Sequence, residues 1–223
     1  MANQEFLDLL KRNWPGLSEA TYVSISDFRE WIIDENSRQN LTKLLSPKEF
    51  FEGHVLDVKA LLECGLVDFP AMDLGSGGGV PGFLSALVSP DRWILADSEG
   101  HKAAFLTRSV EKFGLQASVR VFSGRAEKFL DGVPSSEAPK TVVARAVGPI
   151  ERIYTWIRPC STWNNLVLLK GPRWEEEWSA VQQSRFRNEL KWTDSFRYTV
   201  GDEKKQRIIV KIQRVPRGTL KKV

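Results

Sequence analysis

Histidine and cysteine are scarce in this chain. Its 223 residues include two of each, His54, His101, Cys64 and Cys160. A zinc site needs several such ligands at recognisable spacing, and these four residues do not provide it. We therefore expect no metal site and no metal catalysis. The two cysteines stand in unrelated contexts, which favours free thiols in a reducing compartment.

Long apolar runs are also missing. No window approaches the ~20 apolar residues that a membrane-spanning helix requires. The N-terminal stretch MANQEFLDLLKRN lacks the pattern of a signal peptide. With 42% hydrophobic and 27% charged residues, the composition is that of a globular protein. We expect a cytoplasmic protein that does not associate with membranes.

The most informative stretch runs from Ala71 to Gly82 and reads AMDLGSGGGVPG. A short apolar run reaches Asp73, four glycines follow within residues 75–79, and Pro81 indicates the start of a helix. Glycine permits φ > 0 and close approach of a ligand, and the N-terminus of a helix attracts anions. The stretch therefore predicts a strand, a loop that holds a nucleotide-like cofactor, and a helix.

Two glycine fingerprints fit this loop. Gly77, Gly79 and Gly82 match the G-x-G-x-x-G of dinucleotide folds, but in that fingerprint the first glycine directly follows the strand. Here Gly75 is nearest the strand, and with Asp73 it gives the pattern D-x-G-x-G-x-G. This pattern resembles motif I of class I S-adenosylmethionine methyltransferases. A glycine-rich turn alone is weak support, so the rest of the chain has to decide.

Strand-like and helix-like segments alternate after residue 70, whereas residues 1–68 have helical periodicity. Ser46-Pro-Lys-Glu49 forms a capping box before a helix that should end near Gly65. The alternation predicts a parallel sheet with helices on both faces. The predicted strands are 71–74, 93–96, 118–122, 141–144 and 165–169, and the predicted helices are 81–88, 99–113, 149–158 and one opened by Pro172.

The C-terminal part breaks this alternation. Strand-like residues 191–200 and 206–214 are joined by a connection that suits a hairpin and is too short for a parallel crossover. A mostly parallel seven-stranded sheet closed by an antiparallel hairpin is typical of class I methyltransferases and not of dinucleotide folds. We predict this Rossmann-like α/β fold, with a helical segment at 1–68, a cofactor-binding domain at 69–214 and a basic tail at 215–223.

Polar residues end several predicted strands, and ligands of open α/β sheets bind at these carboxyl ends. Asp97 ends the second strand, where an acid accepts hydrogen bonds from ribose hydroxyls. The alternative is a helix N-cap, a role that is also open to the adjacent Ser98. Glu127 follows the third strand in the sequence Arg125-Ala-Glu and is a candidate contact to an adenine edge. Its alternative is an exposed acid at the start of a helix.

Two basic residues end the next strands. Arg145 lies between two alanines beside the topological switch point, where its planar guanidinium suits a cofactor or a substrate phosphate. An ion pair with Asp73 or Glu127 is the alternative. Lys170 ends the fifth strand and is a further candidate for the substrate.

The helical segment holds a possible acid–base pair. His54 and Asp57 share one face of the helix after the capping box, which invites a general-base role. The pair lies outside the nucleotide-binding half, and this favours a structural or substrate-positioning role. Asn40 belongs to a polar turn before that helix and is either a cap or a substrate contact. Trp174 and Trp178 are expected in the core or against a partner rather than as a base-stacking platform.

The charge is unevenly distributed. Residues 1–70 hold 7 Lys/Arg and 12 Asp/Glu, whereas residues 71–223 hold 25 and 16. The last ten residues contain Arg214, Arg217, Lys221 and Lys222 and no acid. A basic half with a basic tail suits a polyanion such as RNA. A solubilising surface on an ordinary enzyme explains the charge equally well.

Together these motifs resemble one family, the small-subunit ribosomal RNA guanine-N7 methyltransferases G, also called glucose-inhibited division protein B. The matching elements follow the family's order through most of the chain. They are Asn40-Leu-Thr42, His54-Val-Leu-Asp57, Asp73 to Gly82, Asp97-Ser98, Lys102, Phe105-Leu106, Arg125-Ala-Glu127, Arg145-Ala146, Leu169-Lys-Gly171 and the strand from Arg207 to Lys211.

The resemblance implies a bacterial enzyme that moves the methyl group of S-adenosylmethionine to N7 of a guanosine in the decoding region of 16S RNA, as naked RNA or in the 30S subunit. A monomer is favoured. Carried over by position, the residues at the cofactor would be Gly75, Val80, Ala126, Glu127 and Arg145, with Asp97 at the ribose. The glycine pattern adds Asp73, Gly77 and Gly79 to this site, and the substrate candidates are Asn40, His54, Asp57 and Lys170.

This chain departs from the family's pattern around the substrate candidates. Gly53 precedes His54 where the family usually has arginine, Val58 replaces a serine, and residues 99–101 are less basic than expected. These departures leave the cofactor motifs intact and bear on the RNA target.

The expected chemistry needs no general base. Guanine N7 already carries a lone pair, so the enzyme has to orient donor and acceptor, and we expect Arg145 to contribute to that orientation. Two alternatives remain open at this point. One is a class I methyltransferase that acts on another RNA, a protein or a small molecule, and the other is a non-catalytic RNA-binding ribosome-assembly factor.

Overall fold

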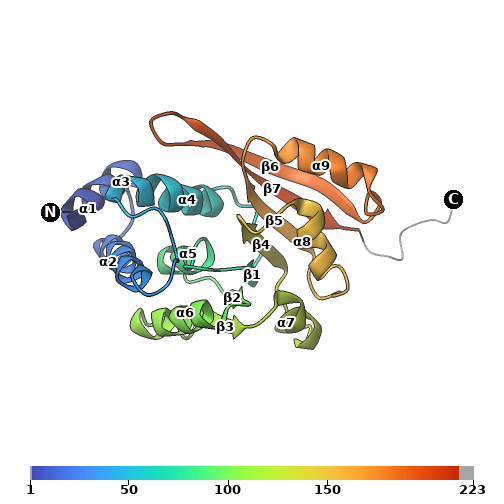
Figure 1. Cartoon of the computed structure of the whole chain (residues 1–223), viewed down its shortest axis with the longest axis horizontal. Helices are drawn as coiled ribbons and strands as arrows, with labels where there is room; N and C mark the ends of the chain where they lie inside the picture. Colours follow the sequence, from blue (N-terminus) through green and yellow to red (C-terminus); the bar gives the residue numbers. More distant parts are fainter. Residues whose placement is uncertain (1, 216–223) are drawn as a thin grey trace.

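A computed structural model describes residues 2–215 and shows a seven-stranded sheet in the order β3-β2-β1-β4-β5-β7-β6 (Figure 1). β1 to β5 are parallel, β7 is antiparallel to β5, and β6 is antiparallel to β7. The predicted fold class is therefore confirmed. The strands are β1 (Ala71–Leu74), β2 (Trp93–Asp97), β3 (Val119–Ser123), β4 (Thr141–Arg145), β5 (Asn165–Lys170), β6 (Leu190–Val200) and β7 (Lys205–Arg214).

Helices cover both faces of the sheet, because successive residues of each buried strand point to opposite faces. On β5, Val167 and Leu169 join the hydrophobic cluster with the N-terminal helices, while Leu166 and Leu168 join the cluster on the other face. The first face carries α1 (Ala2–Asn13), α2 (Glu19–Asn36), α3 (Pro47–Phe50), the π-helix η1 (Phe51–Val55), α4 (Leu56–Glu63), α5 (Gly82–Val88) and α6 (Gly100–Lys112). The second carries α7 (Ala126–Gly132), α8 (Ile150–Ile157) and α9 (Trp174–Gln183).

The sequence-based expectations hold for most element boundaries and fail at two places. The predicted helices did not include residues 126–132, where only the alternative interpretation of Glu127 implied one; these residues form α7, which places Glu127 in a first helical turn. The helix after the glycine loop begins at Gly82 rather than Pro81, which occupies the N-cap. The capping box at Ser46 and Glu49 is present as predicted.

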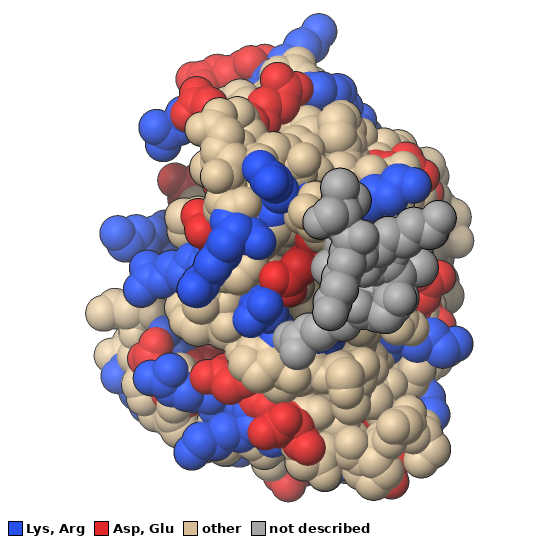
Figure 2. Space-filling view, turned by 90° about the vertical axis from the view of Figure 1, so that its right-hand side faces the viewer, with Lys and Arg blue, Asp and Glu red and all other residues tan. Residues whose placement is uncertain are grey.

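The exposed charges do not form one unbroken basic face on the side of the molecule that Figure 2 shows. Lys and Arg are interspersed there with Asp and Glu. Residues 216–223, which hold most of the predicted basic tail, lie outside the described residues. Among the described residues, no helix combines the length and apolar character needed to cross a membrane.

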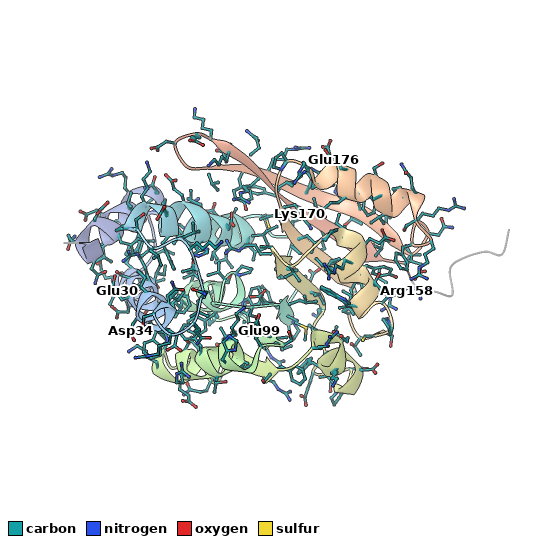
Figure 3. All side chains as sticks on the ribbon, in the orientation of Figure 1. Glu30, Asp34, Glu99, Arg158, Lys170 and Glu176 are labelled. Carbon is teal, nitrogen blue, oxygen red and sulfur yellow. The ribbon has the colours of Figure 1, made fainter. Side chains whose placement is uncertain are left out.

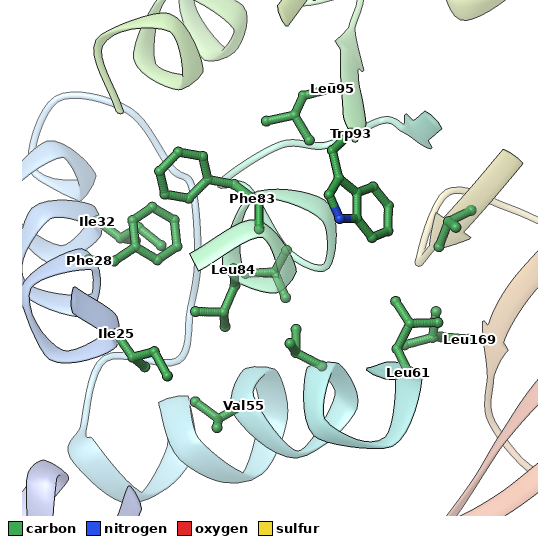
Figure 4. Packing of buried hydrophobic residues seen from close by; sticks show 14 of the residues in the cluster. Ile25, Phe28, Ile32, Val55, Leu61, Phe83, Leu84, Trp93, Leu95 and Leu169 are labelled. Atoms are coloured by element: carbon green, nitrogen blue, oxygen red, sulfur yellow. The ribbon is translucent and has the colours of Figure 1, made fainter. Parts of the chain in front are cut away.

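Helix α2 shows how the N-terminal segment joins the rest of the protein. Glu30 and Asp34 lie on its outer side (Figure 3) and are at least half exposed. Its inner side presents Ile25, Phe28 and Ile32 to the core beside α5 (Figure 4). The ring of Phe28 lies 4.5 Å from that of Phe83 on α5, measured between centroids. The helical segment therefore packs directly behind the glycine loop.

Candidate active site

The glycine loop follows β1, and three of its glycines have backbone angles in the left-handed region. Its φ angles are +73° at Gly75, +53° at Gly77 and +89° at Gly79, values that favour glycine. A Cβ on Gly79 would lie 2.9 Å from Cβ of Phe83 and 3.0 Å from Phe28, so packing against α5 and α2 also requires glycine there. A Cβ on Gly77 would meet only the Gly75 carbonyl oxygen, at 3.9 Å. At Gly77, therefore, the loop leaves room for a ligand to approach the backbone.

Asp97 lies at the end of β2 and contacts Gly77. Its Oδ2 accepts a hydrogen bond from the Gly77 amide at 2.8 Å, and its Oδ1 accepts one from the Glu99 amide at 2.9 Å. A carboxylate has about four acceptor positions, so both oxygens keep capacity for ribose hydroxyls. Ser98 does not cap α6 as expected, since the N-cap is Glu99 and makes no side-chain cap bond. Asp97 itself supports this turn.

Asp73 lies beneath the loop rather than at its surface. It is fully buried, and its Oδ2 accepts a hydrogen bond from the Gly82 amide at 2.8 Å, which ties β1 to the start of α5. Oδ1 has no partner among the described residues. Burial raises the pKa of Asp73 to about 6, against the opposing effect of the Gly82 N–H. The geometry gives Asp73 the role of holding the loop's shape.

Three other predicted cofactor residues lie around the same end of the sheet. Val80 is buried in the cluster with the N-terminal helices, and Ala126 is buried on the other face. The side chain of Glu127 is 29% exposed and lies 3.6 Å from the guanidinium of Arg125. Glu127 is thus an acid in the first turn of α7, as its alternative interpretation stated, and it retains exposed carboxylate surface for a ligand.

The loop and its surroundings fit S-adenosylmethionine. Gly77 leaves room for close approach, Asp97 has free acceptor capacity for ribose hydroxyls, and both are joined by a hydrogen bond. β1 and β4 are neighbours although they are not consecutive, which makes their boundary the switch point where ligands of such sheets bind.

A cleft of about 920 Å³ opens on the other side of this switch point; we call it the acceptor cleft. It lies between the carboxyl ends of β4 and β5, the capping-box helix and the β6–β7 hairpin. Polar and charged side chains converge on it. They include Asp57, Arg145, Lys170, Glu177 and Tyr198.

Arg145 joins β4 to the helical segment. Its Nη1 donates to the Gly53 carbonyl at 2.6 Å and to Oδ2 of Asp57 at 2.8 Å, and its Nη2 donates to Nδ1 of His54 at 2.7 Å. The alternative of an ion pair is therefore realised, but the proposed partners, Asp73 and Glu127, were wrong. The actual partner, Asp57, lies 88 residues earlier in the chain.

These contacts fix the state of His54. Nδ1 of His54 lies 2.7 Å from Nη2 of Arg145 and 3.1 Å from the Gly53 carbonyl oxygen. Because the guanidinium can only donate and lies closer, Nδ1 accepts from it and carries no proton, and the Gly53 carbonyl accepts from Nη1 of Arg145 instead. Nε2 then carries the proton and donates to Oγ1 of Thr42, 2.9 Å away. Burial, followed by the charge of Arg145, lowers the pKa of His54 to about 3. A neutral, fully engaged imidazole suits a structural role, as the sequence favoured, better than a general base.

Tyr198 completes this cluster and was not predicted from the sequence. Its hydroxyl donates to Oδ1 of Asp57 at 2.7 Å, across 141 positions of sequence. Burial and the adjacent charge of Asp57 raise the pKa of Tyr198. Strand alternation in β6 places Tyr198 with Phe196 on the face toward the helical segment, but the sequence contains no signal that pairs it with Asp57.

Lys170 occupies the end of β5, as predicted (Figure 3). Its Nζ donates to the Gly148 carbonyl and to Oε2 of Glu177, both at 2.7 Å. Asn40 lies away from the acceptor cleft, in a separate hollow of about 640 Å³ beside Glu99 and His101.

Two remaining expectations concern aromatic residues and metals. Trp174 is buried edge-on against Trp192, with ring centroids 4.8 Å apart, so its predicted packing role is confirmed. Within residues 2–215, no group of three or more His, Cys, Asp and Glu side chains is arranged to hold a metal ion.

Comparison with known proteins identifies the family. The family model described as rRNA small subunit methyltransferase G matches residues 21–207. A protein of that name from Rhodopirellula baltica is 30% identical over 79% of this chain and 75% of its own length. One from Solibacter usitatus is 30% identical over 87% of this chain and 91% of its own length.

A solved structure shares the fold. The structure of an MtNAS mutant in complex with S-adenosylmethionine superimposes with a TM-score of 0.54 at 15% identity, covering 96% of this chain and 77% of that one. The family match extends through the helical segment from α2 onward, the glycine loop, Asp97 and the acceptor cleft as far as β7. The chain belongs to the rRNA small subunit methyltransferase G family and is an S-adenosylmethionine-dependent methyltransferase.

Proposed function

We propose that this chain transfers the methyl group of S-adenosylmethionine to N7 of a guanosine in 16S ribosomal RNA, with the cofactor over the glycine loop and the guanine in the acceptor cleft. The observation that carries this assignment is the pairing of two sites across one switch point. Gly77 and Asp97 form the first beside β1, and the polar cleft at the ends of β4 and β5 forms the second.

The cofactor side would use groups whose geometry is already fixed. Asp97 would accept hydrogen bonds from the ribose hydroxyls, and the Gly75–Gly77 backbone would border the rest of the molecule. Glu127 would contact the adenine edge, and Asp73 would keep the loop in shape from below. When bound, S-adenosylmethionine supplies an electrophilic methyl group on a sulfonium.

The acceptor side would orient the base rather than activate it. Because N7 of guanine has a lone pair, no residue has to remove a proton, and the neutral, buried His54 is consistent with that. Arg145 would act through position: it fixes η1 and α4 against the end of β4, and its guanidinium also borders the cleft. Holding donor and acceptor in line supplies the rate enhancement.

The substrate itself is proposed to be 16S RNA, free or within the 30S particle, in the cytoplasm. The family's name specifies small-subunit rRNA, and the positive excess of residues 71–223 suits a polyanion. A second candidate function has no specific observation in its favour.

The test is mass spectrometry of nuclease-digested 16S RNA from cells with and without this gene. We expect one 7-methylguanosine-containing fragment to disappear without the gene and to return when the gene is restored. An unchanged fragment set would contradict the proposed function.

A further inference from the structure

The carboxylate of Glu177 has one engaged oxygen and one available oxygen at the acceptor cleft. Its Oε2 accepts hydrogen bonds from Nζ of Lys170 at 2.7 Å and from the amide of Ile150 at 3.0 Å. Its Oε1 has no hydrogen-bond partner among the described residues, and Glu177 lines the cleft with a side chain that is 30% exposed. The free oxygen therefore belongs to a partly exposed side chain that borders the cleft.

Three elements hold this carboxylate in place. Lys170 comes from β5, Ile150 begins α8, and Glu177 lies in the first turn of α9. Lys170 is itself anchored to the Gly148 carbonyl in the β4–α8 connection at 2.7 Å. A carboxylate that is oriented before the ligand arrives loses little entropy on binding it.

The other carboxylates at the cleft are engaged differently. Both oxygens of Asp57 have partners, Arg145 and Tyr198. Glu49 holds the capping box with Ser46 through its Oε2, far along the chain from the strand ends. Asp202 and Glu203 belong to the hairpin turn and pair with Lys48 and Lys205. The side chain of Glu52 lies by Lys48 and by Gly201 in the hairpin turn. Asp57 and Glu177 each bond to the last residue of a strand, Arg145 or Lys170, and of these two carboxylates Glu177 keeps an oxygen without a partner among the described residues.

We propose that Glu177 selects guanine by accepting hydrogen bonds from its Watson–Crick edge. This inference rests on the proposed function, since it concerns the same acceptor base. Only purines have N7, so the enzyme must distinguish guanine from adenine. Guanine presents two adjacent donors, N1–H and the N2 amino group, whereas adenine presents an acceptor at N1 that a carboxylate repels. Reading of this edge is common where RNA bases are unstacked.

The orientation of the base follows from its chemistry. N7 and the N2 amino group lie on opposite sides of the guanine ring system. A base held at N2 by Glu177 on α9 therefore directs N7 away from α9, toward the switch point beside the glycine loop. Glu177 would fix both the identity and the direction of the base.

The variant Glu177→Gln separates this role from a structural one. Lys170 and the Ile150 amide are both donors, so they retain the amide oxygen of the glutamine at the place of Oε2. The glutamine NH₂ group then occupies the place of Oε1 and turns the free acceptor into a donor. Glu176→Gln is the matched control, because Glu176 is exposed on the same helical turn and its side chain makes no hydrogen bond or ion pair with another described residue (Figure 3).

The experiment compares methylation rates on 16S RNA carrying guanosine or inosine at the target position. Inosine lacks only the N2 amino group. We expect the wild-type protein and Glu176→Gln to prefer guanosine in kcat/KM by roughly 10- to 100-fold, the range for one hydrogen bond to a charged group. Glu177→Gln should lose most of this preference by slowing on guanosine, with unchanged cofactor affinity. Comparing preferences between variants cancels any effect of inosine on the RNA itself.

The possible results distinguish an error in the Glu177 assignment from an error in the proposed function. A full guanosine preference in folded Glu177→Gln would overturn the assignment, and so would a wild-type protein that methylates both RNAs equally. Loss of the preference in Glu52→Gln alone would move the role to Glu52 and contradict the assignment. If the wild-type protein methylates N7 of the target purine in neither RNA, the proposed function itself is contradicted.

Discussion

The two halves of the site are built in different ways. The glycine loop is local: Asp73, Gly75, Gly77 and Gly79 lie within seven residues, and backbone conformation sets their geometry. The acceptor cleft is assembled from distant segments. There, Arg145 bonds to Asp57 across 88 positions, and Asp57 bonds to Tyr198 across 141.

This difference explains what each half tolerates. A loop set by positive φ and close packing fails when a side chain is added. A cluster held by mutual hydrogen bonds is destabilised when one partner is removed, because the buried polar groups that remain are left without a hydrogen-bond partner. Substitutions that add a side chain to the loop or remove a partner from the cluster therefore test the two halves separately.

Asp57→Ala should destabilise the protein most. It leaves the guanidinium of Arg145 without its carboxylate and the hydroxyl of Tyr198 without its acceptor, and Asp57 itself is buried. Breaking a buried ion pair in this way costs roughly 3–5 kcal/mol, measurable by urea unfolding. The control Asp202→Ala removes an exposed partner of Lys48 and should change stability little. A loss for Asp57→Ala as small as that of the control would show that the cluster does not stabilise the fold.

Gly79→Ala should destabilise the protein by a somewhat smaller amount, roughly 2–4 kcal/mol, from backbone strain at φ +89° and overlap with Phe83 and Phe28. Gly132→Ala is the control, since a Cβ there meets nothing within 4 Å. Denaturant unfolding of both variants checks this. Equal stability of the two variants would contradict the packing role assigned to Gly79.

The lowered pKa of His54 makes the stability of the folded protein depend on pH. This pKa is 6.5 when unperturbed and about 3 in the folded protein, so below pH 6.5 the unfolded state binds the additional proton. Stability therefore falls as pH drops from 7 toward 3, and the His54 contribution between pH 7 and pH 5 is roughly 2 kcal/mol.

His54→Gln should remove that part of the pH dependence, because glutamine can still accept from Arg145 and donate to Thr42 without titrating. Unfolding at pH 7 and pH 5 measures the difference. Identical pH dependence in both proteins would mean that His54 is not held neutral. Since N7 needs no base, single-turnover methyl transfer should persist in this variant.

The same contrast explains what could be predicted from the sequence. The glycine loop and Asp97 are readable because a strand, a turn and a helix are encoded by neighbouring residues. The parallel sheet and the closing hairpin follow from alternation and from connection length. Both depend on patterns within short stretches of chain.

The partners in the cleft could not be predicted, because they depend on how distant elements pack. The sequence indicated that Arg145 was special and that His54 and Asp57 shared a helix face, but not that the three meet. Tyr198 was one polar residue among several in β6. Glu177 was not predicted as a site residue, because its contact with Lys170 depends on where α9 packs relative to the end of β5.

The division of the site into a cofactor half and an acceptor half is tested most directly by calorimetry of S-adenosylmethionine binding to Asp97→Ala and Tyr198→Phe. Asp97→Ala should weaken cofactor binding by roughly 1.5–3 kcal/mol, the value of a charged hydrogen bond. Tyr198→Phe, which removes only a hydroxyl at the cleft, should leave cofactor affinity unchanged. Unchanged cofactor affinity in folded Asp97→Ala, together with weakened cofactor affinity in Tyr198→Phe, would contradict this division.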